Sequence, residues 1–357
     1  MPRFLGLGRG TGILDLSSYT PILASCSGSS GSKSLSATGS FVAGQRIFII
    51  QMTGTGAGTN FEDNYVVSYS AGTITTLYSL EFTYTDSGTS QAQVVVVPEA
   101  ASITGSINVD AWDGNINGIF VAACSGQFNG QVYGAGKGFR GGAGHKRSDG
   151  VIGVQGESYN GVGTSSNAAN DGAGGGAGVL AITSGNGGGG SYGTLGDDGY
   201  GGGLVGGTKG STYGIQTLVE LFMGSGGGGA FDNGNVATGG NGGPGGALAR
   251  IYAGYIGSTA IINVDGEIGS TSTYNGGSGT GGSISGKARG ISPSAILSAL
   301  GGISNTTGQT TGGGGGKGGD GRIALDICSG EITTNPAAYF QRGGFSYCSS
   351  SISGLLL

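Results

Sequence analysis

Few residues of this chain could catalyse a reaction through a histidine or a carboxylate. The 357 residues include one histidine, His145, and only 20 Asp and Glu. Glu157 and the pair Asp197-Asp198 are isolated in the sequence, so nothing indicates the two closely spaced carboxylates that glycoside hydrolysis requires. Gly-x-Gly-x-x-Gly patterns recur because glycine is common, but none joins a strand pattern to a helix pattern, as a dinucleotide site would. We therefore predict no enzyme and no bound cofactor.

Asp110, Asp113 and Asn115 are the best candidates for a metal site. Carboxylate and amide oxygens are ligands that Ca²⁺ accepts. Trp112, the single tryptophan, lies among them and is expected to seal the core of the N-terminal domain, which is the interpretation we favour. No Cys-x-x-Cys occurs, so a zinc site has no support. The sequence predicts no metal.

Four cysteines are widely separated along the chain: Cys26, Cys124, Cys328 and Cys348. They can be read as small buried hydrophobic residues or as one or two long-range disulfides. Cys124 and Cys328 occupy the same place in two repeat units described below. If those units stack side by side, this pair is the first disulfide to test.

Aromatic residues lie in the segments between glycine tracts and are candidates for binding a receptor. Aromatic side chains on loops offer rigid, flat contact surface to sugars or proteins. The alternative is that they pack across the glycine-rich faces and close the core. The candidates are Tyr159, Tyr192, Tyr200, Tyr213, Phe231 and Tyr274.

The distribution of glycine divides the chain. Of 87 glycines, 67 lie within residues 126–325. With 36% hydrophobic residues and a net charge of −5, the chain lacks the composition of a disordered protein. Six prolines exclude collagen, and an isoelectric point near 4.8 argues against nucleic-acid binding.

Residues 1–117 have the pattern of an N-terminal β domain. Short runs rich in β-branched and aromatic residues alternate with Gly-containing turns, and none has a clear 3.6-residue apolar period. The clearest runs are 45–52, 66–69, 73–78, 80–85 and 91–97. We expect a β-sandwich or a barrel, acting in attachment or assembly.

Residues 118–330 contain a repeat. Four segments share a glycine, a short apolar strand, a small residue and another glycine, and three of them directly follow a glycine tract. They begin at Gly118, Gly178, Gly246 and Gly321. Residues 331–357 then read as a C-terminal strand or interface segment.

The glycine tracts carry a period of three. In 239–246 and at the end of 312–321, the residues that interrupt glycine lie three apart. That is the period of a polyproline-II-type helix, and Pro244 suits its backbone angle. We favour packed polyglycine-II helices closed by short strands over flexible linkers or the turns of a β-solenoid. Residues 291–300 are the best helix candidate, and 214–223 could form a strand, a helix or an oligomer contact.

Taken together, the tracts and their closing strands resemble the tip adhesins of some bacteriophage long tail fibres, built on polyglycine-II helices. The phrase at 136–142, followed by 156–159, also resembles glycine-rich bacterial and viral surface proteins. In such adhesins, loops between the helices contact the host receptor. The N-terminal β domain departs from a simple tip adhesin.

The expected protein is all-β and non-enzymatic: a viral tail-fibre or spike component that binds a host receptor, either a glycan or an outer-membrane protein. The alternative is a structural subunit of a virion coat or extracellular filament. The N-terminus has no apolar signal-peptide core, which favours a virion over a secreted coat. We expect a place on the virion surface or outside the cell, contacts with other fibre proteins, a homo-oligomer such as a trimer, no nucleic acid and no membrane insertion.

Overall fold

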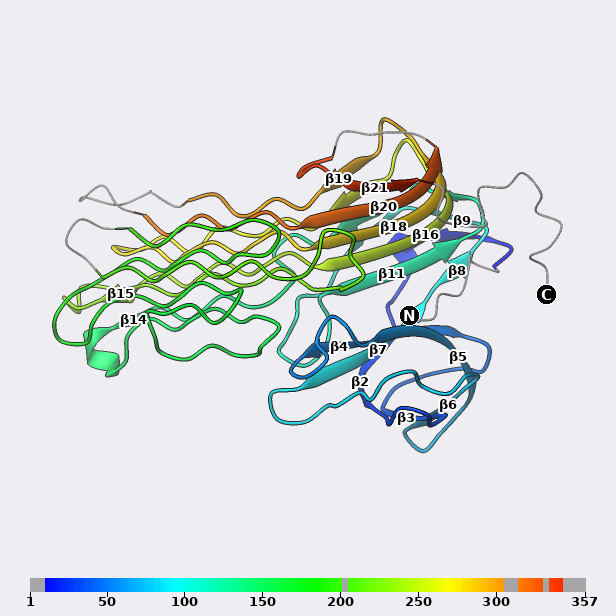
Figure 1. Ribbon diagram of the computed structural model, residues 1–357, viewed down its shortest axis with the longest axis horizontal. Helices are drawn as coiled ribbons and strands as arrows, with labels where there is room; N and C mark the ends of the chain where they lie inside the picture. Colours follow the sequence, from blue (N-terminus) through cyan, green and yellow to red (C-terminus); the bar gives the residue numbers. More distant parts are fainter. Residues whose placement is uncertain (1–9, 201–204, 305–313, 330–333, 343–357) are drawn as a thin grey trace.

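The computed structural model describes residues 10–200, 205–304, 314–329 and 334–342. Within these ranges the chain is mostly β, with two 3₁₀ turns as its helices: η1 (Leu16–Ser18) and η2 (Arg147–Asp149). None of these described helices is long and apolar enough to cross a membrane. A barrel and two sheets lie at one end of an elongated molecule, and the glycine-rich segments extend to the other (Figure 1).

The N-terminal β domain is a closed six-stranded barrel, one of the two predicted forms. Its strands follow the order β2-β3-β6-β5-β4-β7. They are β2 (Leu23–Ser27), β3 (Ser34–Ala37), β4 (Arg46–Thr53), β5 (Phe61–Ser70), β6 (Thr73–Thr76) and β7 (Gln91–Val97). Alternation along β4 points Ile47 and Ile49 into the barrel core and Phe48 and Ile50 out of it. The predicted strand at 80–85 contributes only an isolated bridge at Tyr84.

The second unit contains two parallel sheets. A nine-stranded sheet joins β1 (Ile13–Asp15), β8 (Glu99–Ala100), β9 (Ser102–Thr104), β11 (Ile119–Cys124), β12 (Gln127–Phe128), β16 (Leu248–Ile256), β18 (Ser283–Ile291), β20 (Arg322–Ser329) and β21 (Tyr339–Arg342). A four-stranded sheet joins β10 (Ser106–Asn108), β13 (Gln131–Tyr133), β17 (Ile261–Asn263) and β19 (Ile296–Ser298). A separate small pair joins β14 (His145–Lys146) and β15 (Phe231–Asp232).

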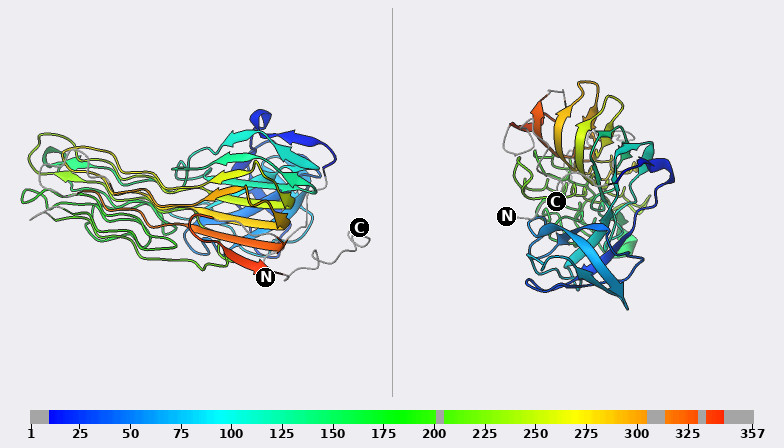
Figure 2. Two further views of the ribbon diagram at one scale, coloured as in Figure 1. Left: turned by 90° about the horizontal axis from the view of Figure 1, so that it is seen from above. Right: turned by 90° about the vertical axis from the view of Figure 1, so that its right-hand side faces the viewer.

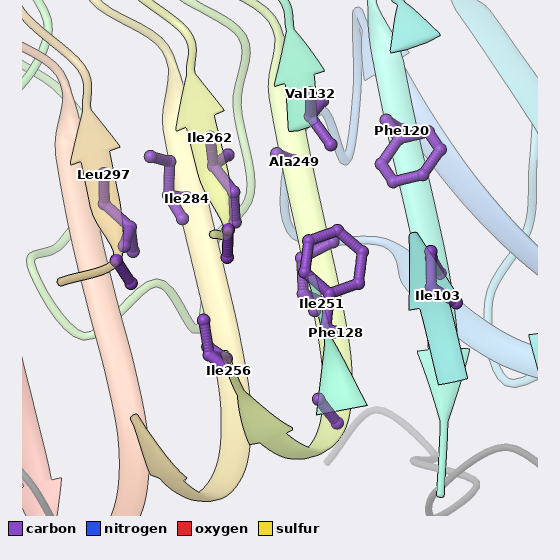
Figure 3. Close-up of a cluster of buried hydrophobic side chains, with 14 of the residues drawn as sticks. Ile103, Phe120, Phe128, Val132, Ala249, Ile251, Ile256, Ile262, Ile284 and Leu297 are labelled. Atoms are coloured by element: carbon purple, nitrogen blue, oxygen red, sulfur yellow. The ribbon is translucent and has the colours of Figure 1, made fainter. Parts of the chain in front are cut away.

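Each repeat unit forms one rung of a stack. A strand of the large sheet turns into a strand of the small sheet, and the next rung pairs with it in parallel. Equivalent apolar side chains therefore line up: Ile107, Val132, Ile262 and Leu297 are successive register partners in the small sheet. Together with Phe120, Ile251 and Ile284 of the large sheet, they fill the core between the two sheets (Figure 3).

The outer face of the large sheet carries the barrel. Phe48 and Ile50 of β4 share a buried cluster with Val121 and Leu248 of the sheet. Polar groups are buried beside them: Arg46 pairs with Asp63 at 3.1 Å, and the Tyr252 hydroxyl donates to Asp63 at 2.9 Å. The barrel is thus joined to the sheet by a packed interface.

Three sequence predictions are corrected by this architecture. The change of architecture falls near Pro98 rather than after residue 117, because β8, β9 and β10 pair with strands of the glycine-rich unit. The helix predicted at 291–300 is a turn followed by β19, since its apolar residues complete the fourth rung. Among the predicted repeats, the segment at 178–185 forms a turn rather than a rung.

The predicted Cys124–Cys328 disulfide is wrong, because Cys124 is a free, buried thiol. Cys124 lies on β11 and Cys328 on β20, with β16 and β18 between them. Neighbouring strands are about 4.8 Å apart, so three steps exceed the reach of a disulfide. The units do stack, but these two are not neighbours. Cys26 is likewise free and buried, and Cys348 lies outside the described residues.

Candidate functional site

Long glycine-rich segments leave the sheets, run to the far end of the molecule and return (Figure 2). Their backbone hydrogen bonds repeat every three residues. Along 226–229, the N–H groups donate in turn to Glu157, Gly243, Gly188 and Val154. Three neighbouring segments are contacted, and the fourth donor returns to the first of them. Each segment is therefore held from several sides.

The segment 276–282 repeats this pattern with other neighbours. Its amides at 276, 279 and 282 donate to 270, 267 and 264, which belong to one antiparallel neighbour. Those at 277 and 280 donate to 228 and 225, and those at 278 and 281 donate to 316 and 319. Backbone polar groups buried between the segments are thereby paired, as burial requires.

Close approach explains why these positions are glycine. At Gly228 an added Cβ would come within 3.0 Å of the Gly175 carbonyl, and at Gly242 within 3.0 Å of the Gly227 carbonyl. Neither glycine has the positive φ that would by itself exclude a side chain. Glycine is therefore required by packing between backbones and not by the local conformation.

The far ends of these segments are loops that are joined to one another by hydrogen bonds. We call them the tip loops, and they comprise 147–152, 178–184, 232–238, 270–275 and the residues Tyr200 and Val205. Ser148 N–H donates to Asn235 Oδ1 at 2.7 Å, and Ser272 Oγ to Thr238 O at 2.6 Å. Gly178 N–H donates to Val205 O at 2.8 Å.

One buried carboxylate organises the loop 232–238. Asp232 accepts hydrogen bonds from the backbone N–H groups of Gly234, Val236 and Ala237 at 2.7 to 3.0 Å. The loop therefore has a defined conformation although its apex is exposed.

The tip loops expose apolar side chains. Val236 has 83% of its surface exposed, Ile182 75% and Tyr200 65%. The full set of large exposed apolar residues on these loops is Val151, Leu180, Ile182, Tyr200, Val205 and Val236. Apolar side chains gathered on ordered loops are typical of a surface that contacts a partner.

The six aromatic candidates fall into different environments. Tyr192 and Phe231 are completely buried, so they cannot contact a receptor in this structure. Tyr159 and Tyr213 are partly buried, with ring centroids 4.8 Å apart. Tyr274 is also partly buried. Tyr200 alone of the six is well exposed, and it lies at the tip.

The buried aromatic residues instead join the glycine-rich region to the barrel. Phe222 packs at 5.1 Å from Tyr213 and 5.5 Å from Tyr159, and it contacts Gly58 of a barrel loop. Leu221 N–H donates to Gly58 O at 2.8 Å. The apolar insert 214–223 thus forms neither strand nor helix, and Leu221 and Phe222 near its end are buried against the barrel. Burial raises the pKa of Tyr192 to about 12.

Other candidates for chemistry are held in local structure. Asp113 accepts from the N–H groups of Asn115 and Ile116, which forms a turn. Trp112 is buried against Phe139 in the cluster between the barrel and the large sheet, not in the N-terminal barrel core as predicted. Arg140 and Glu157 form an ion pair at 2.9 Å. Among residues with described positions, no three His, Cys, Asp or Glu side chains gather closely enough to hold a metal ion.

Sequence reasoning missed most of the tip surface. It selected aromatic residues, whereas five of the six exposed apolar residues at the tip are aliphatic. The available signal was aliphatic residues within a short segment between two glycine tracts, as in Val179-Leu180-Ala181-Ile182 and Asn235-Val236-Ala237.

Comparisons with protein-family models, with curated proteins and with solved structures found no match to this chain.

Proposed function

We propose that the glycine-rich segments are polyglycine-II-type helices packed into a rigid bundle. Such a helix has three residues per turn and no internal hydrogen bonds, so successive amides point to different neighbours. The three-residue recurrence of donors along 226–229 and 276–282 supports this assignment. So does the close backbone approach at Gly228 and Gly242.

We propose further that the protein is a non-enzymatic receptor-binding component of a viral tail fibre or spike. The observation that carries this proposal is the cluster of exposed apolar side chains on the tip loops, at the end of the bundle farthest from the barrel. A stiff bundle that holds such loops clear of the rest of the molecule suits contact with a cell-surface receptor. The barrel would then attach the protein to other virion proteins, and the protein would act at the virion surface or outside the cell.

A structural subunit of a coat or filament is the second candidate. Val42 and Val67 of the barrel and Ile296 of the small sheet are exposed at the opposite end from the tip loops. Burial of these residues against another copy of the chain would suit such a subunit or a homo-oligomeric fibre. The two candidates differ in whether the tip loops bind a cell.

A cell-binding experiment separates them. The double variant Ile182→Ser, Val236→Ser removes apolar surface from the tip, and the matched control Val42→Ser, Val67→Ser does so on the barrel. If the tip binds the receptor, labelled tip variant should lose adsorption to cells that bind the wild-type protein, while the barrel variant adsorbs normally and assembles poorly. Normal adsorption of a folded tip variant would reject the proposal.

A further inference from the structure

A polar groove runs along the corner where the large sheet turns into the small sheet. Its volume is about 360 Å³, within the usual range for small-molecule sites. No lining residue carries a charge; the lining is Ser17, Thr104, Gly105, Ser106, Asn129, Gln131 and Thr259. The groove lies away from the tip loops and from the barrel interface, so neither proposed activity uses it.

The groove is built by the stack of rungs. Thr104 and Ser106 come from the first rung, Asn129 and Gln131 from the second, and Thr259 from the third. Adjacent rungs are about 4.8 Å apart, so the polar groups follow one another at a regular spacing along the groove. Ser17 of η1 lines the groove beside Gly105.

Hydrogen bonds orient the two amides that line the groove. The Tyr133 hydroxyl donates to Gln131 Oε1 at 2.8 Å, which leaves the Gln131 amide nitrogen as a donor. Asn129 Nδ2 donates to Gln127 Oε1 at 3.0 Å, which leaves Asn129 Oδ1 as an acceptor. The second rung therefore leaves one donor, on Gln131, and one acceptor, on Asn129, at the groove.

The charge of the neighbourhood also restricts the ligand. The carboxylate of Asp15, beside Gly105, already accepts from the N–H and the hydroxyl of Ser17 at 2.9 and 2.6 Å. Within the groove the remaining groups are hydroxyls. Those of Ser17, Thr104 and Thr259 donate within the protein and keep their acceptor capacity, whereas that of Ser106 can donate or accept. Tyr133 lies on the same face of β13 as Gln131 and leaves part of its ring exposed beside the groove. An aromatic ring of this kind can pack against an apolar face of a ligand.

We propose that this groove binds a neutral saccharide through its hydroxyl groups. A sugar hydroxyl both donates and accepts, so it can accept from the Gln131 amide and donate to Asn129 Oδ1. Phosphorylated or carboxylated sugars are disfavoured because no cation lines the groove. This site is independent of the receptor proposal, which concerns the opposite end of the molecule.

Saturation-transfer NMR on the full chain tests the site, with D-glucose, D-galactose and D-mannose as neutral probes and glucose 6-phosphate as the charged comparator. We expect at least one neutral hexose to bind and glucose 6-phosphate not to. Gln131→Ala should weaken binding at least tenfold. Tyr133→Phe should weaken it about two- to tenfold, because the amide loses the hydrogen bond that orients it.

Ile296→Ala is the matched control, since Ile296 stands in the same column of the small sheet as Gln131 but outside the groove. It should bind like the wild-type protein, and thermal unfolding should show that all three variants fold. Three results would each overturn the proposal. They are no binding of any neutral hexose at ~0.1 M, where only very weak binding would be needed, equal binding by a folded Gln131→Ala variant, and preference for the phosphorylated sugar. Cell adsorption through the tip should be unchanged in Gln131→Ala.

Discussion

Gly228 illustrates how single glycines determine the packing of this molecule. Its amide donates to Gly188, and its Cα faces the carbonyl of Gly175 on another segment. The neighbouring atoms belong to backbones that are themselves hydrogen-bonded on other sides. They therefore cannot move aside for a methyl group as a flexible side chain could.

Gly228→Ala is accordingly expected to destabilise the protein by about 3 kcal/mol or more, the upper range for overpacking a rigid interior. Gly12→Ala is the control, because a Cβ at Gly12 meets nothing within 4 Å. Denaturant unfolding of both variants gives the two free energies. Equal stabilities would mean that the tracts are not packed as described.

At this scale the sequence predicted some features and not others. The three-residue spacing of Asn241 and Pro244 indicated the hydrogen-bond period, because that period is local to one segment. Which segments become neighbours depends on how all the glycine-rich segments pack together. The burial of Tyr192 and Phe231 therefore could not be inferred from the sequence. Composition alone cannot distinguish an aromatic residue on a loop apex from one between two segments.

Among the elements, the parallel strands of the large sheet carry ionisable groups on the face that also bears the barrel. Tyr252 of β16, Lys287 of β18 and Asp326 of β20 are successive register partners. Burial and, to a smaller extent, the nearby charge of Arg250 lower the pKa of Lys287 to about 8, against the opposing effect of Asp326 and Asp63. Burial also raises the pKa of Asp326.

This shift predicts a pH dependence of stability. In the unfolded chain this lysine has a pKa of about 10.4. Between pH 8 and pH 10 it therefore holds its proton more fully in the unfolded chain than in the folded chain. The contribution of Lys287 to stability therefore rises with pH across this window, and below pH 8 its buried charge opposes folding fully. Lys287→Met should remove the rise. Thermal unfolding of both proteins at pH 7, 8, 9 and 10 measures it, and a stability difference independent of pH would refute this assignment.

The elements themselves were only partly predictable. The repeat beginning at Gly118, Gly246 and Gly321 indicated strands because apolar runs between glycines are local signals. Strands β8, β9 and β10 have two or three residues each, which is too short to show the two-residue alternation of a strand. They can be recognised only by their pairing with strands of later rungs. Residues 291–300 do not form the predicted helix, because pairing of β19 with β17 outweighs the local helix propensity.

The whole molecule has two unlike ends. The barrel is anchored to the rungs through Phe48, Val121 and Leu248 and to the glycine-rich region through Phe222. The bundle then carries the tip loops away from this anchored end (Figure 1). The proposed division between an attachment end and a contact end requires that the bundle be rigid.

Rigidity of the bundle is therefore the central claim, and hydrogen exchange of its backbone amides tests it most directly. The amides of 226–229 and 276–282 are bonded to several neighbours, so they should open only when the unit unfolds. We predict protection at these glycines comparable to that in β16 and β18. Exchange at the rate of an unstructured chain, while β16 and β18 stay protected, would contradict the account.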